Sequence, residues 1–210
     1  MIAPFVWGQG VFVNLNFERA TIVPSSTFLP LVVATSTLPY WTAYIGSSPL
    51  DNIVYNDLTV GSPAVSIHDS ASSFQQPLNG SYSVILQHSG VDPTSASIGQ
   101  TGQVPATSLS LLFDCVNYQN VQVTFRGTPL PLMLLNTTPN YAVVGADISS
   151  FASQSGELRF TGLSLSPTAL DDIRFSTIAV PEPSTFALVG IGGLVLILGA
   201  LSRVPKAEKS

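Results

Sequence analysis

The stretch VNLNFE, residues 13–18, alternates apolar and polar side chains along its whole length. Val13, Leu15 and Phe17 would share one face of an extended chain, with two asparagines and a glutamate on the other. This period of two is typical of a strand that has one buried face. The stretch therefore predicts a strand at the start of a β domain.

Further short segments of this kind follow, and glycine, proline and asparagine separate them. Residues 23–38 are rich in proline, serine and threonine and predict an irregular loop, and residues 148–153 could form one helical turn. No helical periodicity precedes residue 180, so the pattern predicts an all-β fold, a β-sandwich. The expected strands cover residues 52–55, 64–68, 81–87, 108–115, 120–126, 131–136, 141–147, 157–165 and 172–176.

The composition fits an exported β domain better than a helical cytosolic one. Only 9% of the 210 residues are charged, and 45% are hydrophobic. Ten acids and four arginines precede residue 181, which gives this part a net charge of −6 and excludes a nucleic-acid footprint. The single cysteine, Cys115, lies in an apolar run and is expected to be buried. No nucleophile elbow, phosphate loop or zinc-protease motif is present, so we do not expect an enzyme.

The two ends of the body, VNLNFE and LDDIRFS (residues 170–176), resemble the opening and closing strands of jelly-roll domains with the galactose-binding-like fold. That resemblance implies a jelly-roll β-sandwich that often serves as a carbohydrate-binding module. It also implies a possible structural calcium held by Glu18, Asp171 and Asp172, whose oxygens are ligands that calcium takes. The alternative is that the Asp-Asp pair belongs to a turn and strand start, with Arg174 as its partner.

Three aromatic residues gather before Gly46 and are the candidate ligand site. Tyr40, Trp41 and Tyr44 could form a platform on which sugar rings stack. The alternative is that they are ordinary core and rim residues of a sandwich. Of the two histidines, His68 and His88, neither has metal-site spacing, and both are expected at the surface or at strand ends.

The C-terminal segment has the properties of a membrane span. Residues 186–201 carry no charge and no proline, and three basic residues follow them. As a helix these sixteen residues would be about 24 Å long, against a hydrocarbon core of about 30 Å. The basic end would stay in the cytoplasm and direct the body outward. The sequence thus predicts one C-terminal transmembrane helix over 186–202 after the β domain.

Pro181, Glu182 and Pro183, the apolar run and a basic end that starts at Arg203 stand in fixed order. Together they resemble the PEP-CTERM sorting signal of Gram-negative bacteria. The resemblance implies export through the inner membrane, recognition by an exosortase-type processing protease and removal of the tail. The basic end departs from the family pattern, because it has one arginine followed by spaced lysines instead of an arginine cluster.

These features divide the chain into five expected parts. Residues 1–10 are apolar without a basic start and are expected to be the remnant of a truncated signal peptide. The β-sandwich covers 11–178, a Pro-Glu-Pro linker 179–185, the membrane helix 186–202 and a basic cytoplasmic tail 203–210.

Taken together, the sequence predicts an exported protein in transit through the inner membrane, with its body on the periplasmic side, and then at the cell surface or outside. Its β-sandwich could bind extracellular polysaccharide. The alternatives are a passive structural protein of the envelope or matrix and, less expected, a glycan-active enzyme, which would need two carboxylates across a cleft.

Overall fold

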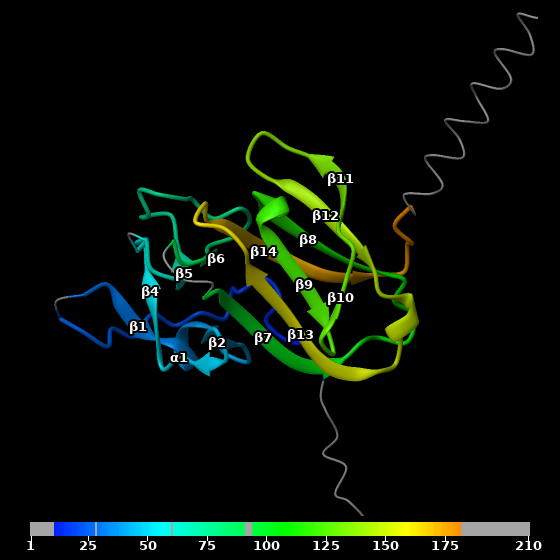
Figure 1. Ribbon diagram of the computed structural model, residues 1–210, viewed down its shortest axis with the longest axis horizontal. Helices are drawn as coiled ribbons and strands as arrows, with labels where there is room; N and C mark the ends of the chain where they lie inside the picture. Colours follow the sequence, from blue (N-terminus) through cyan, green and yellow to red (C-terminus); the bar gives the residue numbers. More distant parts are fainter. Residues whose placement is uncertain (1–10, 28, 60, 91–93, 182–210) are drawn as a thin grey trace, which may run out of the picture. The chain divides into compact units, whose positions relative to one another are not determined.

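The computed structural model describes residues 11–27, 29–59, 61–90 and 94–181 (Figure 1). Its first half contains β1 (Leu31–Val33), α1 (Ala34–Thr37), β2 (Thr42–Ile45), β3 (Ser48–Pro49), β4 (Asn52–Tyr55), β5 (Ala64–His68), β6 (Ser83–Gln87) and β7 (Ala96–Gln103). The second half contains β8 (Ser110–Val116), η1 (Tyr118–Asn120), β9 (Val121–Phe125), β10 (Thr128–Pro129), β11 (Met133–Thr137), β12 (Ala142–Asp147), η2 (Ser149–Phe151), β13 (Ser155–Gly162) and β14 (Thr168–Ser176). The described domain is thus all-β, with short helical turns.

The strands form two sheets. An eight-stranded sheet has the order β1-β4-β5-β6-β14-β8-β12-β11, and a six-stranded sheet has the order β10-β9-β13-β7-β2-β3. Neighbours pair antiparallel except β4 and β5, which are parallel. The last strand, β14, lies between β6 and β8 near the middle of the larger sheet (Figure 1). Residues far apart in sequence are therefore brought together around β14.

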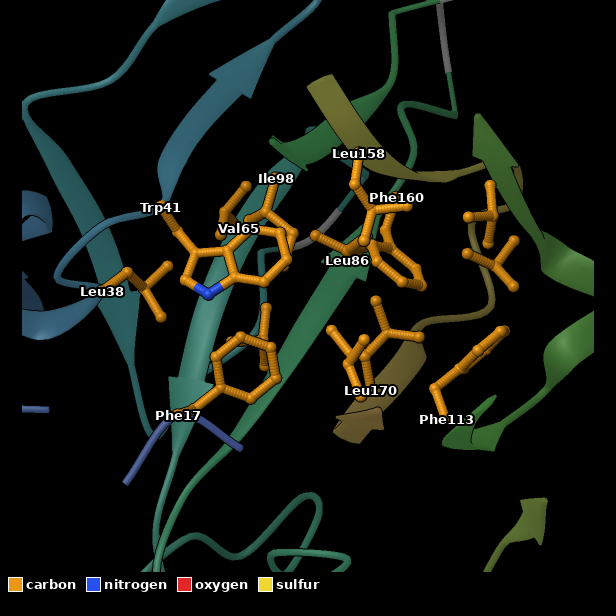
Figure 2. Close-up of a cluster of buried hydrophobic side chains, with 14 of the residues drawn as sticks. Phe17, Leu38, Trp41, Val65, Leu86, Ile98, Phe113, Leu158, Phe160 and Leu170 are labelled. Carbon is orange, nitrogen blue, oxygen red and sulfur yellow. The ribbon is translucent and has the colours of Figure 1, made fainter. Parts of the chain in front are cut away.

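The two sheets share one hydrophobic interior. Phe113 of β8 meets Phe160 of β13 edge-on, with ring centroids 5.3 Å apart. Trp41 packs against Phe160 and against Phe17, at centroid distances of 6.2 and 5.8 Å. Figure 2 shows these rings among buried aliphatic side chains from both sheets, such as Leu86. Aromatic packing between the layers therefore joins the two sheets into one core.

Most of the predicted strands are confirmed. The segments predicted over 52–55 and 64–68 coincide with β4 and β5, and the other seven from residue 81 onward each overlap a strand. The helical turn predicted within 148–153 is confirmed as η2. In the predicted loop 23–38, however, the apolar residues Leu31–Val33 form β1, which pairs with β4, and Ala34–Thr37 form the short helix α1.

The strand predicted over residues 13–18 is wrong. Asn14 and Phe17 have φ values of 54° and 59°, which belong to left-handed backbone and not to a strand. The backbone N–H and C=O of Val13 bond to the Gln100 side chain of β7, at 2.6 and 2.8 Å. The C=O of Leu15 accepts a bond from the N–H of Ile173 in β14. The segment cannot form one continuous ladder because its neighbouring residues bond to different sheets.

The predictions for the two chain ends lie outside the described residues, namely the signal-peptide remnant at 1–10, the helix 186–202 and the tail 203–210. In the part that the structure describes, no helix is long and apolar enough to cross a membrane. The division of the chain into two units falls between Ala179 and Val180.

Candidate functional site

Residues from the first segment, the 79–80 turn and the last strand line a small cavity of about 90 Å³. We call it the acidic cavity, and its lining residues are Asn16, Glu18, Asn79, Gly80, Asp171 and Asp172. The fold therefore brings the three predicted metal ligands to one place. It does so because β14 lies beside β6, so that its acids face the turn before β6.

Asp171 is the buried member of the acidic cavity. Its Oδ2 accepts hydrogen bonds from Ser83 Oγ at 2.6 Å and from the backbone N–H of Asn79 at 3.0 Å. Its Oδ1 accepts the N–H of Asp172 at 2.7 Å. Burial raises the pKa of Asp171 to about 6, the three donors oppose this rise, and the charge of Glu18 adds to it. The carboxylate holds the turn in place although its charge is costly there.

Glu18 holds the other side of the same turn. Its Oε1 accepts the backbone N–H groups of Ser81 and Tyr82 at 2.8 and 3.0 Å. Gly80 has a φ of 60°, and a Cβ added there would collide with the Glu18 carboxylate. A side chain at this position would therefore strain the backbone and require the Glu18 carboxylate to move. The 79–82 turn is thus fastened by one carboxylate from each end of the domain.

Asp172 has a different partner. The register of β14 against β8 shifts between Asp171 and Arg174, and Asp172 has a φ of 42°. Its Oδ2 lies 2.6 Å from Arg174 Nη1, which also approaches the buried Asp114 at 3.5 Å. Burial raises the pKa of Asp114, and the charge of Arg174 opposes that rise. Of the predicted alternative, the structure shows the Arg174–Asp172 pair. The two acids lie inside β14 and not at a strand start, and Asp171 bonds to Ser83 and Asn79 instead.

The acidic cavity does not fit a metal centre as it stands. In the described part of the chain, no group of three or more histidine, cysteine, aspartate or glutamate side chains is arranged to share a metal ion. The oxygens are of the type that calcium takes. However, those of Glu18 and Asp171 accept protein hydrogen bonds, and Asp172 is paired with arginine. The prediction of nearby acids is correct, and the arrangement is a hydrogen-bonded cluster.

Comparisons of this chain with protein-family models, with curated proteins and with solved structures find no match.

Of the two interpretations of the aromatic residues, the structure supports the core alternative for Trp41 and not the platform. This side chain is only 4% exposed, and its Nε1 donates to the backbone C=O of Asn14 at 3.0 Å. The Tyr44 ring is covered by the Arg159 guanidinium, whose central carbon lies 4.0 Å from the ring centroid. Tyr40 is 62% exposed. The three rings do not form one exposed surface, because Trp41 is part of the core.

A larger hollow lies where the chain crosses from β10 toward β11. We call it the β9–β10 groove; it has a volume of about 490 Å³ and is lined by Tyr118, Gln119, Val121, Gln122, Pro129, Leu130, Pro131, Leu132 and Leu163. Ligand sites commonly occupy roughly 300–1,000 Å³. The acidic cavity, and a hollow of about 180 Å³ beside Phe74, are smaller than this range. By size, the groove is the best of these three for an organic ligand.

The β9–β10 groove was not predicted from the sequence, although its composition suits a sugar. Pro129, Leu132 and Leu163 give it apolar walls, and the Tyr118 ring and the exposed amides of Gln119 and Gln122 add polar groups. Its residues come from three separate parts of the chain, so no local pattern marks it. The prolines and leucines of 129–132 are its only signal in the sequence.

His68 is at a strand end, as predicted, but it is fully buried. Its Nδ1 lies 2.8 Å from Ser72 Oγ, and its Nε2 lies 3.2 Å from the backbone C=O of Asp57. A neutral ring with its proton on Nε2 donates to Asp57 and accepts from Ser72. Burial lowers the pKa of His68. Cys115 is buried as predicted, and burial raises the pKa of its thiol.

Proposed function

We propose that this chain is an exported bacterial protein of the cell surface or extracellular matrix, delivered by a C-terminal PEP-CTERM sorting signal. The observation that carries this proposal is the fixed order of Pro181-Glu182-Pro183, the apolar run 186–201 and the basic end. The unit boundary between Ala179 and Val180 supports it, because it lies directly before the motif. Pro181, which the structure describes, is exposed, as a protease recognition site must be.

We further propose that the body is a jelly-roll β-sandwich that binds polysaccharide in the β9–β10 groove. Sugars present flat C–H faces and hydroxyl groups, so they bind where apolar walls and an aromatic ring stand beside hydrogen-bonding side chains. Tyr118, Gln119 and Gln122 supply these groups around apolar walls. The volume of about 490 Å³ leaves room for a sugar unit of a longer chain.

The binding part is tested by pull-down of the purified chain on the polysaccharides of a bacterial matrix. We expect Tyr118→Ala to reduce the bound fraction strongly. Gln122→Ala, which changes an exposed amide and leaves the core intact, should reduce it several-fold. Tyr40→Ala is the matched control, because Tyr40 is an exposed tyrosine outside the groove. Equal binding by Gln122→Ala and the unchanged chain, or an equal loss in Tyr40→Ala, would refute the groove as the site.

The sorting part is tested by mass spectrometry of the mature protein. We expect its C-terminus to lie near Pro181-Glu182-Pro183 in a host that has an exosortase, and the intact tail in a host without one. A Glu182→Ala chain that is still cut at the same place would contradict recognition of this motif.

A further inference from the structure

The 79–82 turn carries a feature that the proposed function does not use. Asn79 and Gly80 form the only Asn-Gly pair in the sequence. Both residues are exposed, and the backbone N–H of Gly80 donates to Asn79 Oδ1 at 2.9 Å. The nitrogen of Gly80 therefore lies next to the side-chain amide carbon of Asn79. Because Gly80 has no Cβ, nothing on its own side chain hinders a closer approach.

We propose that Asn79 is a site of spontaneous deamidation that adds a fourth carboxylate to the acidic cavity. The Gly80 nitrogen attacks Asn79 Cγ and forms a new C–N bond, which closes a cyclic succinimide. The Cγ–Nδ2 bond breaks, and the Asn79 amide leaves as ammonia with the proton that the Gly80 nitrogen gives up. Water then opens the ring at either carbonyl carbon and leaves aspartate or isoaspartate at position 79. No oxidant or reductant takes part, and solvent water reaches both exposed residues.

The chain contains an internal control for this chemistry. The backbone N–H of Thr137 donates to Asn136 Oδ1 at the same distance of 2.9 Å, and both of these residues are exposed. Thr137 is branched at Cβ, which restricts its backbone and crowds its nitrogen. The two asparagines thus share the starting hydrogen bond and exposure but are followed by different residues. A difference in their rates would reflect the glycine and the turn.

The position of Asn79 gives the reaction a consequence for the domain. Asn79 lines the acidic cavity together with Glu18, Asp171 and Asp172. Its backbone N–H is one of the donors that hold the Asp171 carboxylate. A carboxylate at position 79 would add a like charge beside these acids. We therefore expect deamidation to weaken the turn, and added salt to reduce this effect because it screens like charges.

The same contacts restrain the reaction. Glu18 holds the N–H groups of Ser81 and Tyr82 after Gly80, and Asp171 holds the N–H of Asn79 before it, so the backbone is fixed on both sides of Gly80. Closing the succinimide requires the turn to move. Loss of the Glu18 carboxylate should therefore speed deamidation. The deamidation rate thus measures how strongly Glu18 restrains the 79–82 turn.

The experiment incubates the purified full chain at mildly alkaline pH and follows the peptides that contain Asn79 and Asn136 by mass spectrometry. We expect replacement of NH₂ by OH at Asn79 to be at least several-fold faster than at Asn136, with both aspartate and isoaspartate formed. Deamidation at position 79 should be faster still in Glu18→Ala. In Asn79→Gln, deamidation should disappear from the peptide that contains position 79. Equal rates at Asn79 and Asn136 would overturn the proposal, as would a product that is still present in Asn79→Gln.

A second measurement tests the consequence without waiting for the reaction. We expect Asn79→Asp to lower the thermal midpoint, and this loss should shrink at high salt because salt screens the repulsion between like charges. A loss that is the same at low and at high salt would overturn the charge argument.

Discussion

Replacing Asp171 by asparagine should change how the stability of the domain depends on pH. Asp171 is fully buried, and its pKa is raised from an ordinary value of 3.8 to about 6. Asparagine has nearly the same size, but its NH₂ group cannot accept a hydrogen bond. The Asp172 N–H or the pair of donors from Ser83 and Asn79 would therefore lose an acceptor, at a cost of about 1–3 kcal/mol.

The sign of the pH effect follows from linkage. A carboxyl whose folded pKa lies above its unfolded pKa binds its proton more tightly when the protein is folded. Its contribution to stability is therefore fully present below about 3.8 and is lost as the pH rises through about 6. The difference of about two pH units between these values corresponds to about 3 kcal/mol for a buried group. The unchanged protein loses this free energy on going to neutral pH, and Asp171→Asn does not.

The assay is urea unfolding of both proteins across this pH range, with the free energy of unfolding compared at each pH. We expect Asp171→Asn to be the less stable protein in acid, and the gap to close by about 3 kcal/mol toward neutral pH. Other titrating groups, such as His68, are present in both proteins and cancel in the difference. A gap that stays constant or widens as the pH rises would refute the reasoning.

Three further predictions concern the core, the buried histidine and the metal. Trp41→Ala should lower the free energy of unfolding by about 3–5 kcal/mol because it empties a core site. Trp41→Phe should cost much less, because it removes mainly the hydrogen bond to the Asn14 carbonyl. A loss below about 1 kcal/mol for Trp41→Ala in urea unfolding would contradict a core role for Trp41. Burial lowers the pKa of His68, so its neutral form stabilises the fold, and this contribution is lost as the pH falls below its ordinary pKa of 6.5. In His68→Gln the urea midpoint should fall less as the pH drops below 6.5 than it does in the unchanged protein. An equal fall in both proteins would contradict this. Excess EDTA should leave the thermal midpoint unchanged because the acids have other partners, whereas a rise on adding calcium would show that the cavity takes the ion.

The strands that were predicted correctly are those in which apolar and polar residues alternate within the strand itself. In β9, Val121, Val123 and Phe125 alternate with more exposed residues, and all three are buried. One buried face produces this alternation directly. A pattern of this kind gives the position of a strand, but it does not give the neighbour with which the strand pairs.

β7 was missed, although it lies inside the six-stranded sheet, because its sequence lacks that signal. ASIGQTGQ contains two glycines and no aromatic residue. A Cβ at Gly102 would lie 2.9 Å from the Phe12 ring, and one at Gly99 would lie 2.7 Å from Glu157 Oε1. Gly102 is thus required by the Phe12 ring, and at Gly99 a side chain would displace the Glu157 carboxylate. Such a close approach cannot be read from the strand itself.

The candidate sites divide in the same way. The nearness of Glu18 to Asp171 and Asp172 was implied by the resemblance of the two ends of the body to jelly-roll strands. The turn that completes the acidic cavity was not, because Asn79 bonds to Asp171 across 92 positions in the sequence. The sequence did not decide whether Trp41 lies in a platform or in the core for a related reason, because an aromatic cluster has the same sequence whether it faces the core or solvent. Burial distinguishes the two cases, and burial depends on the whole fold.

The segment with the clearest alternation, residues 13–18, is irregular, and this irregularity positions the acidic cavity. Val13 bonds to β7 in one sheet and Leu15 to β14 in the other, so the chain crosses between the two layers at this point. The turn that follows places Phe17 against Trp41 in the core and leaves Glu18 at the surface beside the 79–82 turn. In a regular strand Phe17 would share a face with Val13 and Leu15. The backbones of Val13 and Leu15 would then have to bond to the same sheet. The alternation therefore predicted correctly that Phe17 is buried, whereas the hydrogen-bond partners on two sheets determined the backbone and the position of the acid.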